Sequence, residues 1–138
     1  MTAPSQKDRS PFAALVLGWV LPGAGHAYAG RWGKAVLFFS LITALVVAGL
    51  VIGKGTNILP NRLWYAAQVC AGGPAIALTP ISQYLAGPNG SNIDWADPLH
   101  EMGTLYTAVA GFLNLLVMMD AYTRLAYPGR SEEQQEGA

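Results

Sequence analysis

The chain has 138 residues, which favours a single domain, and 12 % of them are charged, about half of the roughly 25 % that is typical of soluble domains. The apolar fraction is 52 % and the mean hydropathy is +0.31. The formal net charge is zero, and the single cysteine, Cys70, excludes an intramolecular disulfide and a CxxC motif. This composition favours a multi-pass membrane protein and argues against a nucleic-acid binder.

Long uncharged segments alternate with short charged ones between two polar tails. Since about 20 helical residues cross a hydrocarbon core of about 30 Å, the sequence predicts an all-α integral membrane helical bundle with about four membrane segments. The expected organisation is a polar N-terminal tail over 1–10, a membrane helical domain over 11–127 with segments at about 12–29, 34–53, 63–86 and 102–122, and a polar C-terminal tail over 128–138.

The four segments differ in character. The second is rich in Leu, Val, Ile and Phe on all sides and has no polar face to turn to water. The third is interrupted by Gly72-Gly73-Pro74 and by Pro80, so we expect a kinked or broken helix there. The fourth contains one strongly polar side chain, Asn114.

The distribution of Lys and Arg predicts a topology. With four crossings and a cytoplasmic N-terminus, six of the eight basic residues lie inside, and the loop that contains Asp94 and Asp97 lies outside. This arrangement obeys the positive-inside rule and places both termini in the cytoplasm. If the first segment instead re-enters and returns to its own side, four basic residues lie inside and four outside, and the rule gives no support. Four crossings are therefore preferred.

The segment LPGAGHAYAGRWGKA, residues 21–35, admits three interpretations. An apolar run followed by AYA fits a signal peptide cleaved after Ala29, although the glycine-rich stretch before that site is long. A phosphate loop is disfavoured, because the GxxxxGK[ST] spacing is absent. A bend between two membrane helices accounts for each residue type and is preferred, so the first two segments are expected to form a tight hairpin.

Each residue of this bend has an expected role. Pro22 is expected to end or kink the preceding helix, and Gly23 and Gly25 permit a positive φ or a close backbone approach. Tyr28 suits the headgroup level, and Lys34 can extend to the phosphates. The predicted hairpin motif comprises Pro22, Gly23, Gly25, His26, Tyr28, Gly30 and Lys34.

The stretch PGAGHAYAGRWGKAVLFF carries a resemblance to known proteins. It resembles the PGxGHxYxG signature of small bacterial multi-pass membrane proteins of unknown function, and it is distantly similar to the turn of the two-transmembrane-helix domain family. The match covers residues 18–39, and GTLYTAVAGFLNLLVMMDAYTRL near the C-terminus also resembles the closing segment of the first group. The resemblance implies a membrane hairpin in the bacterial inner membrane and assigns no biochemical role.

Few residues carry recognisable chemistry. His26 is expected to bond a backbone carbonyl and fix the turn; the alternative is a ligand, a proton carrier or a headgroup contact. Asn114 is expected to bond across helices, and Asp120 to pair with Arg124 one turn later. The segment DWADPLHE admits a cation site as an alternative, but a solvated acidic loop before the fourth helix, with Glu101 near the helix N-terminus, is preferred.

The sequence contains no GxSxG, HExxH or other catalytic set, so we expect no enzyme, no catalytic residue, no metal and no cofactor. The favoured function is a non-enzymatic structural or interaction component, with the lipid bilayer and a homo-oligomer or larger membrane complex as partners. Gly49-x-x-x-Gly53 is expected to serve either a helix contact with another chain or packing within this chain. The alternative is a small oligomeric transporter or channel built around His26, Asn114 or Asp120.

Overall fold

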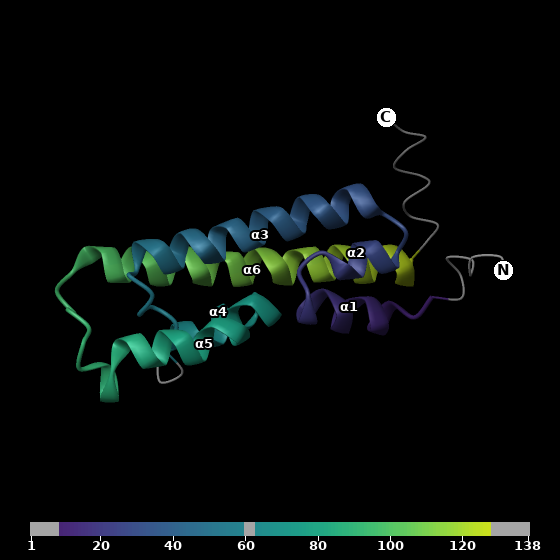
Figure 1. The fold of residues 1–138 in the computed structure, drawn as a ribbon. Helices are drawn as coiled ribbons and strands as arrows, with labels where there is room; N and C mark the ends of the chain where they lie inside the picture. The colour runs from purple at the N-terminus through teal and green to yellow at the C-terminus, as the bar shows by residue number, and fades with distance from the viewer. Residues whose placement is uncertain (1–8, 60–62, 128–138) are drawn as a thin grey trace.

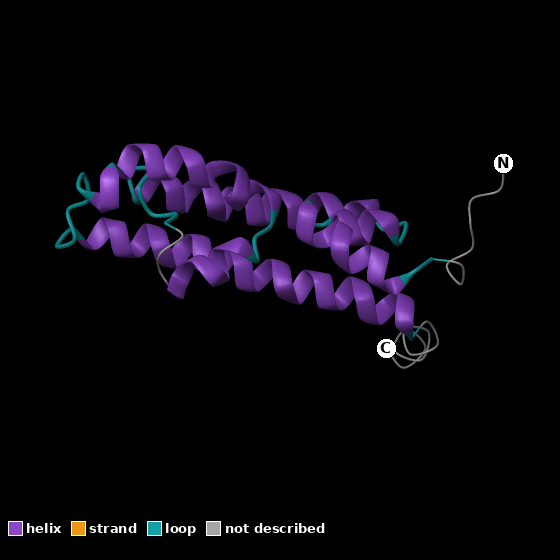
Figure 2. Ribbon diagram, turned by 90° about the horizontal axis from the view of Figure 1, so that it is seen from below, coloured by secondary structure: helices purple, strands orange, loops and turns teal. Residues whose placement is uncertain are grey.

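The computed structural model describes residues 9–59 and 63–127, and that part of the chain consists of helices and loops without a strand (Figures 1 and 2). The expected tails, with Lys7 and Arg130, and the loop residue Arg62 lie outside the described residues, apart from Arg9 and Ser10. The elements in chain order are α1 Pro11–Val20, α2 Ala24–Tyr28, α3 Trp32–Ile52, α4 Leu63–Val69, α5 Gly73–Ala86, the 3₁₀ helix η2 Pro88–Gly90, and α6 Pro98–Ala126.

The two long helices, α3 and α6, lie side by side and antiparallel, and they form the spine of the bundle (Figure 1). Their 21 and 29 residues correspond to lengths of about 32 Å and about 44 Å at 1.5 Å per residue. Small residues allow close contact, since a Cβ atom at Gly103 would lie 2.6 Å from the carbonyl oxygen of Gly49 and from the Cα of Gly53. The GxxxG pair of α3 therefore packs internally against α6.

Two shorter helices lie end to end along the remaining side of α6, α1 over one half and α4 over the other, and α5 packs against α4 and α3 (Figure 1). The chain reverses between α4 and α5, which brings the hydroxyl oxygens of Tyr65 and Thr79 to 3.5 Å. The two halves meet where the indole N–H of Trp19 donates to the carbonyl oxygen of Val69 at 3.2 Å. Each half covers only part of the length of α6.

The prediction of four spanning segments is wrong, because two helices, α3 and α6, are long and apolar enough to cross a membrane. The first expected segment breaks after the ten residues of α1, where Pro22 and then Gly23, with a φ of +82°, follow. α1 packs mainly on α6 and α2, so the first two segments are not a tight pair of full-length helices.

The third expected segment, 63–86, also divides in two. A break in this segment was expected, and it lies between α4 and α5 at Gly72, whose φ is +76°. A Cβ atom there would lie 1.7 Å from the carbonyl oxygen of Trp19, so both the backbone angle and the contact require glycine. Pro80 lies inside α5 without ending it.

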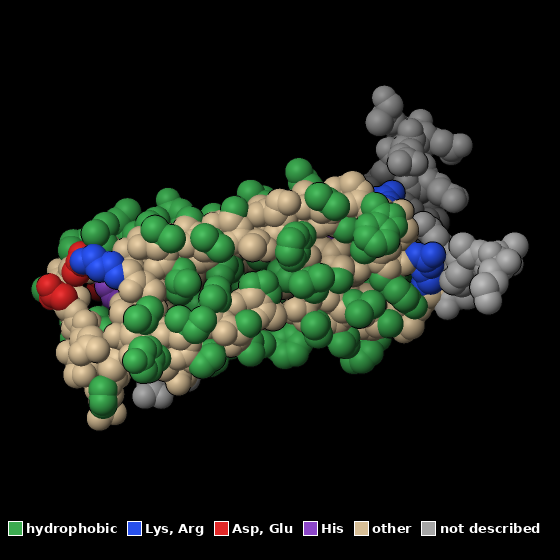
Figure 3. All heavy atoms as spheres, viewed as in Figure 1, with side chains coloured by type: hydrophobic (Ala, Val, Ile, Leu, Met, Phe, Trp, Pro, Cys, Tyr) green, Lys and Arg blue, Asp and Glu red, His purple; other side chains and the backbone are tan. Residues whose placement is uncertain are grey.

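The outer surface of the bundle is apolar along its length. Large side chains such as Val36, Val51 and Leu116 are more than half exposed on α3 and α6. Figure 3 shows hydrophobic side chains along the visible face and charged side chains only at its two ends. The buried core between the helices is formed mostly by small and β-branched residues: Ile42, Val46, Ala71, Ala75, Ala110 and Val117.

Candidate functional site

Two glycines fit the PGAGH turn against its neighbours. Gly23 has a φ of +82°, and a Cβ atom there would lie 2.4 Å from the carbonyl oxygen of Ala35. A Cβ atom on Gly25 would lie 2.5 Å from the carbonyl oxygen of Ala14 in α1 and 3.1 Å from Ala121 in α6. The positive φ and the close approach expected of this pair are both present, and they allow α2 to lie directly on α6.

This packing brings His26 to Asp120, a residue 94 positions away in the sequence. The Nε2 atom of His26 lies 2.9 Å from Oδ2 of Asp120, and Nε of Arg124 donates to both oxygens of the same carboxylate at 2.9 Å. His26 is fully buried, and its ring meets the edge of Phe38 with centroids 5.2 Å apart. The predicted pairing of Asp120 with Arg124 is confirmed.

The prediction that His26 bonds a backbone carbonyl is wrong. The partner of Nε2 is the Asp120 carboxylate, and no described group bonds Nδ1. The physical reason is the path of α6, whose last turns lie directly beneath α2. His26 joins the turn to α6 and does not fix the turn from within.

The remaining motif residues form the outer part of the same junction. The carbonyl of Tyr28 accepts a hydrogen bond from Arg9, whose guanidinium carbon also lies 5.7 Å from the centroid of the Tyr28 ring. Pro22 is buried, Gly30 has a φ of +81°, and Lys34 is exposed at the start of α3. These contacts close this end of the bundle around the His26–Asp120 pair.

Asn114 lies near the middle of α6, where the two half-length elements meet. Its Nδ2 donates to the carbonyl oxygens of Gly18 in α1, at 3.2 Å, and of Cys70 after α4, at 2.9 Å. Its side chain is fully buried, and Oδ1 has no partner among the described residues. The predicted role of Asn114 in bonding across helices is confirmed, and it satisfies carbonyls that the ends of α1 and α4 leave free.

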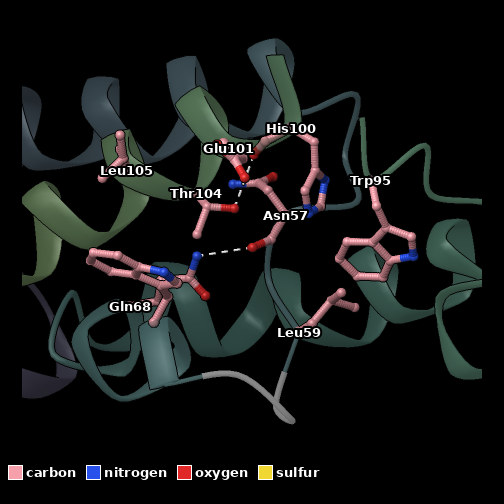
Figure 4. A pocket seen from close by; sticks show the side chains of 9 residues that line it. Asn57, Leu59, Gln68, Trp95, His100, Glu101, Thr104 and Leu105 are labelled. Atoms are coloured by element: carbon pink, nitrogen blue, oxygen red, sulfur yellow. Dashed lines mark hydrogen bonds between the residues drawn. The ribbon is translucent and has the colours of Figure 1, made fainter. Parts of the chain in front are cut away.

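A cavity of about 250 Å³ opens at the other end of the bundle, between α4, the start of α6 and the two loops there (Figure 4). Two indole rings, Trp64 and Trp95, and the side chains of Leu59 and Leu105 supply its apolar lining. Its polar lining comes from Asn57, Gln68, His100, Glu101 and Thr104.

A buried network supports the polar side of this cavity. Nε2 of Gln68 donates to the carbonyl oxygen of Asn57 at 2.9 Å and to Oγ1 of Thr107 at 2.8 Å. Nδ2 of Asn57 donates to the same hydroxyl at 3.3 Å. All three side chains are at most 3 % exposed. Both N–H groups of the Gln68 amide are thus used, and Oδ1 of Asn57 has no partner among the described groups.

The acidic loop predicted before the last helix lies at the rim of this end. Asp97 caps α6 by accepting from the backbone N–H of Leu99 at 3.0 Å, and its carboxylate lies 2.7 Å from Nζ of Lys54. The hydrogen bond from Lys54, followed by that from Leu99, lowers the pKa of Asp97, and the same carboxylate raises the pKa of Lys54. Within 9–59 and 63–127, no three His, Cys, Asp or Glu side chains come together as metal ligands.

A comparison with family models gives one match, over residues 13–132, to a family of unknown function, DUF6677. The chain belongs to this family. The match spans nearly all of α1 and every later helix, so both ends of the bundle lie within the DUF6677 region. No curated protein and no solved structure matches the chain. The similarity to the two-transmembrane-helix domain stays a prediction.

The sequence analysis of this DUF6677 member missed the residues around the cavity. Asn57 lies in a short loop and Gln68 in an apolar segment, and neither belongs to a recognisable motif. One signal was available: a lone glutamine among apolar residues needs partners when its helix is buried. Nothing in the spacing of Asn57, Gln68 and Thr107 indicates that they meet.

Proposed function

We propose that this protein is a non-enzymatic membrane component that crosses the bacterial inner membrane twice, through α3 and α6. The observation that carries the proposal is the apolar surface of these two helices combined with charged side chains at the two ends of the bundle (Figure 3). The length of α3, about 32 Å, matches a hydrocarbon core of about 30 Å. A large apolar surface of this kind is unfavourable in water.

In this proposal the half-length elements enter the membrane from opposite sides and turn back near its centre. α1 is about 15 Å long, half the thickness of the core. Irregular backbone is tolerated at membrane depth only where protein covers it and satisfies its polar groups. The close contact of Gly72 with Trp19, and the bonds from Asn114 to both helix ends, meet this requirement.

The basic residues support an orientation. Among the described residues, Arg9, Arg31, Lys34 and Arg124 belong to the end of the bundle where α1 begins and α6 ends, and Lys54 belongs to the other. The positive-inside rule then places the first of these ends in the cytoplasm. Both termini are again cytoplasmic, but residues 53–59 and 87–97 share the opposite side.

The internal use of the polar side chains supports a role in binding or assembly. His26 bonds Asp120, Asp120 also bonds Arg124, and Asn114 bonds two carbonyls. These contacts hold helices together, and they favour an assembly role over transport through the same residues. The exposed apolar faces of α3 and α6 are then available to lipid, to a second copy or to a larger complex.

Extraction of membranes with alkaline carbonate tests the membrane placement. We expect the full-length protein to stay in the membrane pellet and to dissolve only with detergent. Release into the supernatant, or a monodisperse protein without detergent, would contradict it.

Cross-linking in the native membrane, followed by purification in mild detergent, tests the component role. A defined oligomer or a stoichiometric partner is expected, and a monomer alone would contradict that role.

A further inference from the structure

We propose that the cavity between α4 and α6 binds a small organic ammonium ion, with a primary or quaternary amine, either as a free solute or as a lipid headgroup. The proposal goes beyond the membrane role and does not depend on it, since the cavity is formed by contacts within the chain. Its volume, about 250 Å³, lies just below the roughly 300–1,000 Å³ of sites for drug-sized ligands, so the occupant is small.

The hydrogen-bonding groups around the cavity favour a ligand that donates. Both N–H groups of the Gln68 amide are already used, and no described group donates to its Oε1. Oε1 of Gln68 belongs to a side chain that lines the cavity and is only 1 % exposed, whereas Oδ1 of Asn57 is enclosed beside the backbone of Gly53. A buried acceptor without a partner is costly, and a ligand N–H or O–H group would satisfy it.

Charge at this end favours a cation. Glu101 lines the cavity, and no described cation forms an ion pair with its carboxylate. The described residues here include three carboxylates, Asp94, Asp97 and Glu101, but one lysine, Lys54, which already pairs with Asp97. Among the described residues that line the cavity there is one carboxylate, that of Glu101, and no Lys or Arg, so this lining favours a cation over an anion.

The aromatic lining distinguishes an organic ammonium ion from a metal ion. Trp64 and Trp95 line the cavity, and both are about half exposed. Indole is the side chain that attracts an ammonium group most strongly through its ring face. It offers no oxygen ligand to a hard metal ion, and the described residues contain no cluster of three metal-binding side chains. Two indoles and one carboxylate form a site for an alkylated or primary amine.

Equilibrium dialysis of the full-length protein in a maltoside detergent, against radiolabelled choline or ethanolamine, tests the proposal. We expect saturable binding of at least one of the two, without competition from sodium chloride at equal ionic strength or from inorganic phosphate. Glu101→Gln should weaken binding about tenfold or more, because it removes the charged partner. Trp95→Leu should weaken it about two- to fivefold through loss of one ring face.

Asp94→Asn is the matched control, because it removes one negative charge from the same end at a residue that does not line this cavity. It should leave the affinity within about twofold, and circular dichroism should show all three variants folded. Competition by phosphatidylcholine or phosphatidylethanolamine in mixed micelles, but not by phosphatidylglycerol, would identify a lipid headgroup as the occupant. If none of the three lipids competes, the occupant is a free solute. Absence of saturable binding of both amines, equal competition by sodium, or undiminished binding to Glu101→Gln would overturn the proposal.

Discussion

The two ends of this helical bundle use their polar side chains in different ways. At the end that carries the PGAGH turn, His26, Asp120 and Arg124 bond to one another, and His26 is fully buried. At the other end, Gln68 and Glu101 line a cavity, and no described cation forms an ion pair with the Glu101 carboxylate. The first end is closed by packing around the His26–Asp120 pair, and the second contains an open cavity.

The segment that is easiest to recognise in the sequence and the cavity therefore lie at different ends of the bundle. The turn is the most recognisable part of the sequence because tight packing restricts residue type, as at Gly23 and Gly25. A cavity needs only a few acceptors and some apolar surface, and many sequences supply those. The motif therefore marks a packing junction, and the proposed ligand site lies at the end without a motif.

Replacement of His26 by alanine should have the largest effect on stability. The change removes the hydrogen bond to Asp120 and the contact with Phe38, and it leaves a cavity in a fully buried position. We expect the free energy of unfolding in detergent to fall by about 3 kcal/mol, from the lost packing and the lost hydrogen bond together. Denaturant unfolding followed by circular dichroism measures it.

The matched change at the open end is Glu101→Gln, which should alter the free energy of unfolding by less than about 0.5 kcal/mol, because Glu101 is exposed and no described cation pairs with it. Equal losses of stability in His26→Ala and Glu101→Gln would contradict the difference between the two ends.

Asn114→Ala tests the junction between the two half-length elements and should have an intermediate effect. Two hydrogen bonds across helices are lost, to Gly18 and to Cys70, and such bonds contribute about 0.6 kcal/mol each on average in a membrane protein. We expect a loss of about 1–2 kcal/mol, measured by the same unfolding experiment. An unchanged stability would mean that these carbonyls find other partners and that Asn114 does not hold the junction.

The Lys54–Asp97 pair predicts a small dependence of stability on pH at the open end. The pKa of Asp97 is lowered in the folded protein, so its contribution is present above its unfolded pKa of about 3.9 and is lost as the pH falls through the folded pKa. The pKa of Lys54 is raised, so its contribution is present below its unfolded pKa of about 10.4 and is lost as the pH rises through the folded pKa.

The contribution of the pair to the free energy of unfolding should therefore be constant between about pH 5 and pH 9 and decrease outside that range. The decrease should be small, because the pair lies at the surface. Comparison of the natural protein with Lys54→Met across pH measures this contribution. A difference between the two that grows outside this window would contradict the assignment.

Hydropathy predicts α3 and α6 well, because both are long, apolar and unbroken. It fails at 12–29 and 63–86, because it adds up apolar residues and ignores backbone geometry. Pro22 with Gly23, and Gly72 with its φ of +76°, end helices inside these apolar stretches and turn the chain back. Both breaks were predictable from their glycines and prolines, but the resulting change of topology was not.

The site residues were predictable to different degrees. The pairing of Asp120 with Arg124 follows from helical spacing, and Asn114 within an apolar helix indicates a bond across helices. The pairing of His26 with Asp120 depends on how α2 packs against α6, which local sequence does not specify. The convergence of Asn57, Gln68 and Thr107 depends on a loop conformation for the same reason.

Labelling of single cysteines tests two crossings against four most directly. In a Cys70→Ser background, Lys54→Cys, Ser91→Cys and Lys34→Cys are each exposed to a maleimide that does not cross membranes, in sealed vesicles of known orientation. The account predicts that positions 54 and 91 react from the same side and that position 34 reacts only from the other. Reaction of positions 54 and 91 from opposite sides would contradict the account.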